Sequence, residues 1–128
     1  MEIELEKFEK EISLYQQREL FKECFPETVG TPVISQEHYL WKFHSYPGSP
    51  PSYEYEAQMG KDIIGYYAAI PYRYNYFGKT ITIGMVCDVM TGVKARGKGV
   101  FTKLGKYSTN QLKENNIESF FVLGEHDT

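Results

Sequence analysis

Two glycines stand between basic residues in the segment Arg96-Gly97-Lys98-Gly99, where an apolar run ends and a helix-like run begins. Closely spaced glycines let backbone N–H groups approach a ligand, and a helix that starts behind them adds its positive macrodipole end. Groups arranged in this way bind anions. The surrounding stretch from Val89 to Lys113 has no acidic residue and contains six cations: Lys94, Arg96, Lys98, Lys103, Lys106 and Lys113. The segment predicts an anion site that suits a diphosphate.

The spacing of these glycines differs from two common nucleotide-binding loops. The sequence has no GxxxxGK[ST] pattern, and no GxGxxG follows a first strand of a βαβ unit. An isolated Gly-x-Gly is more often a solvated basic turn than a binding site. The order of strand, loop and helix around this one favours the binding site.

Two carboxylates could move protons beside this loop. Asp88 lies on the strand that leads into the loop, and Glu125, followed by His126, comes after the last apolar run. If these two strands run parallel, the carboxylates flank one crevice, where either could accept a proton from an amine. Asp88 is equally well explained as a surface acid near a turn, and Glu125 with His126 as part of a frayed tail.

The two cysteines, Cys24 and Cys87, are distant in the sequence and have no metal-ligand spacing. We therefore expect reduced, mostly buried thiols, with no disulfide and no metal site. No histidine stands at a recognisable spacing from Cys87, so a nucleophilic role for this thiol has little support.

The first half of the chain predicts one strand and two helices. Alternation of Ile3 and Leu5 with glutamates indicates a short strand. A helical period follows from about residue 9 to 23, and Pro26 ends it. Ser35 can cap a short helix that runs through Phe43, after which the Pro/Gly/Ser cluster at 47–52 forms a loop.

The second half predicts an antiparallel meander followed by a crossover. Three strands, at 52–59, 63–71 and 80–90, are separated by turns at Gly60 and Gly78. The next helix carries apolar residues at helical spacing from Val100 to Leu112 and stops at Asn115-Asn116. A last strand at 117–123 completes an α+β fold with a mainly antiparallel sheet flanked by helices. Because a helix joins the last two strands, we expect them to run parallel, with the glycine loop at their carboxyl-end crevice.

Composition limits the function classes. The 128 residues, 41% hydrophobic, fit one domain spanning 1–128. A net charge of −3 argues against nucleic acid and anionic membranes as partners, and no apolar run approaches the roughly 20 residues of a membrane span, so we expect a cytoplasmic protein. Tyr72, Tyr74 and Tyr76 interleave with Arg73 as in a single-strand RNA binder, but such tyrosines are more often a cross-strand packing face.

The segment from Arg96 to Phe101 resembles the acyl-CoA loop of the GNAT superfamily of N-acetyltransferases, whose pattern is Arg/Gln-x-x-Gly-x-Gly/Ala. Phe101 departs from the small residue usual at the last position. The resemblance follows the order of elements along nearly the whole chain. It implies that Arg96, Gly97, Lys98, Gly99 and Val100 hold the pyrophosphate of acetyl-CoA. It implies also that Val89, Met90 and Thr91 bind the pantetheine arm.

The resemblance implies an acetyl-CoA-dependent N-acetyltransferase in which a primary amine attacks the thioester directly. Asp88 and Glu125 are then the candidate catalytic residues, and His38 and His44 fall in the segment that shapes the acceptor pocket of this fold. "RGKGVFTKL" and the Trp41-Lys42-Phe43 segment are similar to a subgroup found among proteins of sugar-polymer biosynthesis. The expected acceptor is a small-molecule amine, with an amino sugar as one candidate.

A different class remains open, namely a degenerate GNAT fold that binds CoA or a partner without turnover. In the family the sheet continues past the strand expected at 117–123, so this chain is expected to lack the C-terminal elements. The residues "SFFVL" would then leave an apolar edge exposed, and such edges pair with other chains. We therefore expect either a homo-oligomer joined at this edge or a longer polypeptide that covers it.

Overall fold

The computed structural model describes residues 2–45 and 52–120, so Glu125 and His126 lie outside the described residues. In chain order the elements are β1 (Ile3–Lys7), α1 (Lys10–Cys24), the 3-10 turns η1 (Pro26–Thr28) and η2 (Pro32–Ile34), α2 (Gln36–His44), β2 (Tyr53–Met59), β3 (Asp62–Tyr76), β4 (Lys79–Thr91), η3 (Val93–Ala95), α3 (Val100–Glu114) and β5 (Glu118–Phe120).

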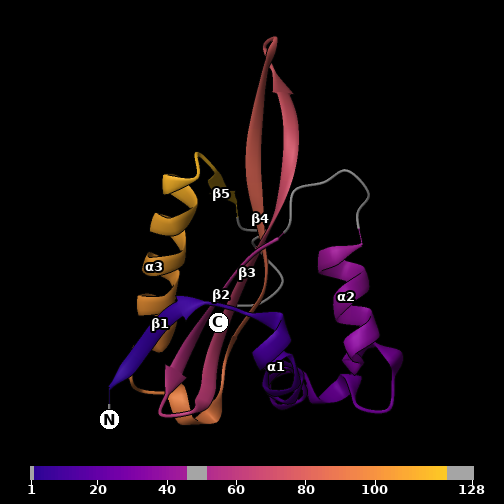
Figure 1. Ribbon diagram of the computed structural model, residues 1–128, viewed down its shortest axis with the longest axis vertical. Coiled ribbons are helices and arrows are strands. Elements are labelled where there is room, and N and C mark those ends of the chain that lie inside the picture. The colour runs from indigo at the N-terminus through magenta and orange to yellow at the C-terminus, as the bar shows by residue number, and fades with distance from the viewer. Residues whose placement is uncertain (1, 46–51, 121–128) are drawn as a thin grey trace.

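The strands form one sheet in the order β1-β2-β3-β4-β5. The first four strands are antiparallel neighbours, whereas β5 runs parallel to β4, with Ile83 opposite Glu118 and Met85 opposite Phe120. Helix α3 connects these parallel strands (Figure 1). The predicted α+β class and its single parallel crossover are therefore confirmed.

Helices cover both faces of the sheet and divide the core in two (Figure 1). On one face α3 packs through its buried Val100, Leu104 and Leu112 against residues of β2, β3 and β4. On the other face α1 and α2 pack against a second cluster, which includes Phe21 and Tyr39. Helices α3 and α2 therefore lie on opposite faces of the sheet.

Strand β2 lies inside the sheet, and this location buries two carboxylates. Glu54 and Glu56 are only 6% and 1% exposed. In the sequence they alternate with aromatic residues, a pattern that does not show whether the polar face meets solvent. Because β2 has neighbouring strands on both sides and helices over both faces, both of its faces are buried.

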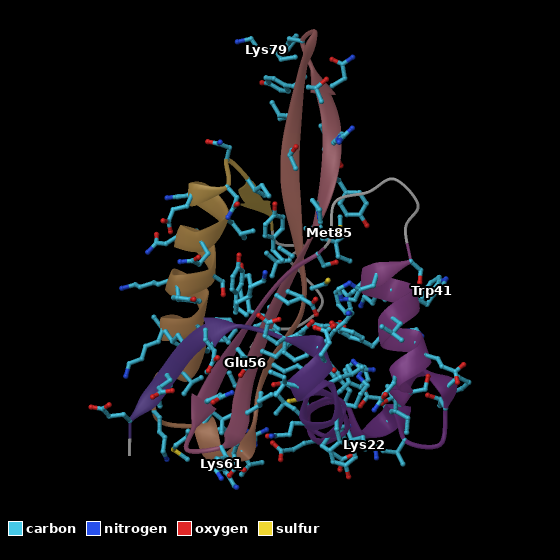
Figure 2. The ribbon with its side chains drawn as sticks, viewed as in Figure 1. Lys22, Trp41, Glu56, Lys61, Lys79 and Met85 are labelled. Carbon is cyan, nitrogen blue, oxygen red and sulfur yellow. The ribbon has the colours of Figure 1, made fainter. Side chains whose placement is uncertain are left out.

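Strand β3 continues beyond the apolar run 63–71 that predicts it, as far as Tyr76. The β3–β4 hairpin projects past the other strands (Figure 1), and Figure 2 shows Lys79 at its tip. Tyr72 pairs with Ile83 and Tyr74 with Ile81, so large side chains follow one face of this arm.

The ends of the helices follow from local chemistry. The Ser35 hydroxyl accepts a hydrogen bond from the His38 N–H at 3.0 Å and caps α2 as predicted. After α3, Asn116 adopts φ 60°, the left-handed conformation expected of a helix stop. No helix within the described residues has both the length and the apolar character needed to cross a membrane.

Candidate active site

The loop between β4 and α3 is built around two glycines with left-handed backbone. Gly97 has φ 79° and Gly99 has φ 70°, and Gly99 is the N-cap of α3 without a side-chain cap. A Cβ added at either position would meet no described atom within 4 Å. The glycines are therefore required by conformation rather than by packing, and open space lies beside each of them.

Backbone N–H groups point out of this loop at the start of α3. The first turn of a helix has N–H groups without partners inside the helix, here those of Val100, Phe101 and Thr102. The Lys98 N–H, in contrast, donates to the carbonyl of Ala95 at 3.2 Å. Lys98 therefore offers its side chain, rather than its amide, to a ligand.

The charges around the loop are unbalanced. Arg96 and Lys98 are exposed, and no carboxylate in the described part of the chain forms an ion pair with either of them. Lys94 instead pairs with Asp62 at 2.9 Å. Two free cations thus add to the positive end of the α3 macrodipole, as an anion site requires.

Contacts from three elements hold the loop in place. The Glu23 carboxylate of α1 accepts a hydrogen bond from the Val93 N–H at 2.7 Å, and the Gly92 N–H donates to the Ile64 carbonyl of β3 at 2.8 Å. Gly65 lets α3 pack closely on β3, because a Cβ there would lie 3.1 Å from Val100 Cγ1. The loop is therefore preformed.

A bulge interrupts β4 just before the loop. Tyr66 pairs with Met90 and Ala68 with Cys87, so Asp88 and Val89 together face Tyr67. Asp88 adopts φ 54°. The bulge turns the Asp88 side chain toward α2, where its carboxylate pairs with Lys42 Nζ at 2.9 Å.

Cys87, beside this bulge, is a protonated thiol at neutral pH. Burial, followed by the charge of Asp88, raises the pKa of Cys87 to about 12. A thiol in that state is a poor nucleophile.

A groove of about 430 Å³ opens between α2 and the base of the β3–β4 arm. Its walls carry rings and a cation, and they comprise His38, Trp41, Lys42, Ser45, Ile70 and Tyr72. Because Lys42 both lines the groove and pairs with Asp88, the groove ends next to the β4 bulge. The groove therefore offers aromatic faces together with a few polar groups to a ligand.

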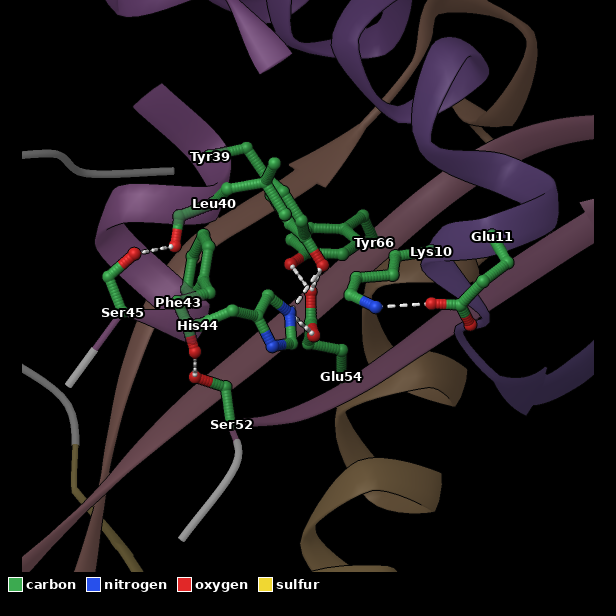
Figure 3. Close-up of polar contacts among 10 residues, drawn as sticks. All are labelled: Lys10, Glu11, Tyr39, Leu40, Phe43, His44, Ser45, Ser52, Glu54 and Tyr66. Atoms are coloured by element: carbon green, nitrogen blue, oxygen red, sulfur yellow. Dashed lines mark hydrogen bonds and ion pairs between the residues drawn. The ribbon is translucent and has the colours of Figure 1, made fainter. Parts of the chain in front are cut away.

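A buried polar network anchors α2 to the sheet (Figure 3). The hydroxyls of Tyr39 and Tyr66 donate to Glu54 Oε1 at 2.5 and 2.6 Å, and His44 Nε2 lies 3.0 Å from Glu54 Oε2. Burial and the Glu54 charge raise the pKa of both tyrosines well above the ordinary value, so both remain donors. Sequence reasoning found His44 but missed Glu54, because the strand pattern gives no sign that this carboxylate is buried.

The predicted site residues fall along one path. Asp88, the segment Val89–Thr91 and the segment Arg96–Val100 follow one another from the β4 bulge to the start of α3. Glu125 lies outside the described residues, so its expected place is not tested. In the part of the chain that the structure describes, no three His, Cys, Asp or Glu side chains gather as metal ligands would.

The family model of the acetyltransferase (GNAT) domain matches residues 9–123. The chain belongs to this family, and acyl transfer is the activity of its class. No curated protein sequence matches the chain.

Solved structures share the fold at low sequence identity. A transcriptional regulator from Bacillus halodurans has TM-score 0.73 and 15% identity, over 97% of this chain and 83% of that one. Glucosamine-6-phosphate N-acetyltransferase from Arabidopsis thaliana has TM-score 0.68 and 14% identity, over 97% and 84%. An aminoglycoside acetyltransferase from a soil metagenome, in complex with sisomicin, has TM-score 0.70 and 15% identity, over 96% and 78%. These likenesses concern the fold alone.

Proposed function

We propose that this protein is an acetyl-CoA-dependent N-acetyltransferase that acts on a primary amine. The observation that carries the proposal is the preformed loop between β4 and α3, in which Gly97 and Gly99 leave open space beside free N–H groups and unpaired cations. The pyrophosphate of acetyl-CoA lies against Arg96–Val100, and its pantetheine arm runs along Val89–Thr91. A diphosphate matches the charge and the donors of this loop.

The chemistry requires a neutral amine and a protonated leaving thiolate. Asp88, on the bulge beside the pantetheine path, accepts the amine proton directly or through water. Glu125 is the second candidate for proton transfer. Because Cys87 stays protonated, the amine attacks the thioester directly and no acyl-cysteine forms.

The acceptor enters the groove beside α2, on the sheet face opposite to α3. Rings of Trp41 and Tyr72 offer flat surfaces, and the groove ends at the Lys42–Asp88 pair. A small-molecule amine such as an amino sugar fits this arrangement. Two structural neighbours have names that state such acceptors, glucosamine-6-phosphate and aminoglycosides. The free thiols of Cys24 and Cys87 support a cytoplasmic location.

One observation favours a second candidate, a module that binds CoA or a protein partner without turnover. The Asp88 oxygen that would accept the amine proton already holds Lys42 Nζ at 2.9 Å. If acceptors never displace this ammonium, the fold binds the cofactor but leaves the amine protonated.

Two measurements test the proposal. Saturating acetyl-CoA or CoA should stabilise the protein, by about 2.7 kcal/mol at a hundred times the dissociation constant. Release of free CoA is then followed with a panel of amines that includes amino sugars. Binding with release supports the enzyme, and binding without release supports the module. Absence of stabilisation by either compound contradicts both.

A further inference from the structure

Lys42 carries a primary amine at the junction between the acceptor groove and the β4 bulge. Its Nζ lies 2.9 Å from Asp88 Oδ1, and the two side chains are only 30% and 15% exposed. The amine that an acceptor must bring to Asp88 is thus already present on the protein itself.

Helix α2 is held so that Lys42 faces the sheet. Tyr39 and His44, on either side of Lys42 in α2, both bond to the buried Glu54, and Phe43 is buried against the sheet. Residues three and four apart share one face of a helix, so Lys42 and Phe43 lie on the same side as Tyr39. The buried contacts of α2 therefore fix the position of Lys42 beside Asp88.

The proposed cofactor path ends beside the same carboxylate. With the pyrophosphate at Arg96–Val100, the pantetheine arm runs back along β4 from Thr91 toward Asp88. The extended strand from Thr91 back to Asp88 is about 10 Å long. An arm that follows this strand therefore ends with its thioester at the level of the bulge. Lys42 Nζ lies at the same level of β4, because it pairs with Asp88.

From this geometry we propose that the protein acetylates its own Lys42, with Nζ taking the place of the external amine. The inference rests on the function proposed above. A bond forms between Nζ and the acetyl carbon while the C–S bond of the thioester breaks. Of the two protons that the ammonium loses, Asp88 passes one to solvent and the departing thiolate takes the other. The products are Nζ-acetyl-Lys42 and free CoA.

The modification changes the site that it uses. An acetylated lysine has no positive charge, so the ion pair with Asp88 is lost and the cation disappears from the groove wall. Asp88 is then free to accept a proton from another amine.

Mass spectrometry of the full chain incubated with acetyl-CoA tests the inference. We expect one added acetyl group, located on Lys42 by peptide mapping, at a rate per molecule that does not change with protein concentration. Lys94 is the internal control, because it also pairs with a carboxylate at 2.9 Å but its side chain is 64% exposed. Purely chemical acetylation should favour Lys94, and trace labelling with an acetyl N-hydroxysuccinimide ester without acetyl-CoA measures that background.

Two variants complete the test. Asp88→Asn should slow acetylation of Lys42 and leave that of Lys94 unchanged, and Lys42→Arg should abolish the main product. Labelling that follows the chemical background, or a rate that rises with protein concentration, overturns the inference. If acetyl-CoA binds and external amines are acetylated while Lys42 stays unmodified, only this inference fails. If acetyl-CoA does not bind, the proposed function fails with it.

Discussion

Asp88 combines an unusual backbone conformation with a charged partner. Its φ of 54° lies in the left-handed region, which non-glycine residues other than Asn, Asp and His rarely adopt. Such conformations concentrate at functional sites because the surrounding structure must hold them. The bulge that produces this conformation also turns Asp88 toward Lys42 and the acceptor groove.

Replacement of Asp88 by Asn should impair chemistry more than binding. Asn tolerates the same backbone region, so the bulge should persist while the proton acceptor is lost. We expect kcat to fall by about 10²–10⁴-fold, the range of general base catalysis, with little change in the acetyl-CoA dissociation constant. Asp62→Asn, at the other lysine pair, is the matched control. Equal kcat values in the parent and Asp88→Asn would remove Asp88 from the mechanism.

Cys87 should behave as an unreactive thiol. With a pKa of about 12, only about one molecule in ten thousand carries the thiolate at pH 8. Iodoacetamide at that pH should leave Cys87 unmodified in the folded protein, and Cys87→Ser should keep normal turnover.

The raised pKa of Cys87 also makes stability depend on pH. The native state holds the thiol proton more tightly than the unfolded chain, whose thiol pKa is about 8.5. The contribution of Cys87 to stability is therefore fully present below that pH and is lost as pH rises toward 12. Rapid alkylation at pH 8, or loss of turnover, would contradict this account.

At the scale of elements, the fit between α3 and the sheet sets the place of the glycine loop. A Cβ on Gly65 would lie 3.1 Å from Val100 Cγ1 and 3.2 Å from Leu104 Cδ2. Gly65→Ala should thus push the start of α3 away from β3, at a cost of about 1–3 kcal/mol in the free energy of unfolding, and weaken acetyl-CoA binding.

Gly105→Ala is the control for that change. A Cβ at this helical position meets no described atom within 4 Å, so the substitution should stabilise α3 by up to about 1 kcal/mol. Urea denaturation and calorimetric titration measure both effects. Unchanged acetyl-CoA binding in a folded Gly65→Ala variant would show that the placement of α3 does not control the loop.

Elements that depend on local chemistry could be predicted from the sequence. Proline and serine signals define the ends of α1 and α2, and the order of strand, glycine loop and helix predicts the parallel crossover. Contacts between distant segments could not be predicted. The Lys42–Asp88 pair joins residues 46 positions apart, and Glu54 is buried beneath Tyr39 and His44 of α2 and Tyr66 of β3. Periodicity reports the face of a residue, not what packs against that face.

At the scale of the whole molecule, the described sheet ends at β5. Beyond β5 no further strand follows in the part of the chain that the structure describes. A second copy that pairs at β5 is our proposal for its partner, since apolar strands such as the one predicted from "SFFVL" pair readily when a sheet edge is free. Light scattering should then show an average mass that rises with concentration. A monomer mass at every concentration would contradict an assembly of this kind.

The central claim is that the loop between β4 and α3 binds the pyrophosphate of acetyl-CoA. Calorimetric titration of the double variant Gly97→Val and Gly99→Val tests it most directly, with circular dichroism to verify the fold. Gly78→Val is the matched control, because Gly78 also has positive φ (81°) and open space but lies in the β3–β4 turn. We predict at least about a hundredfold weaker acetyl-CoA binding for the double variant, since two or more hydrogen bonds to a charged group are lost, and parental affinity for the control. Parental affinity in a folded double variant would contradict the account.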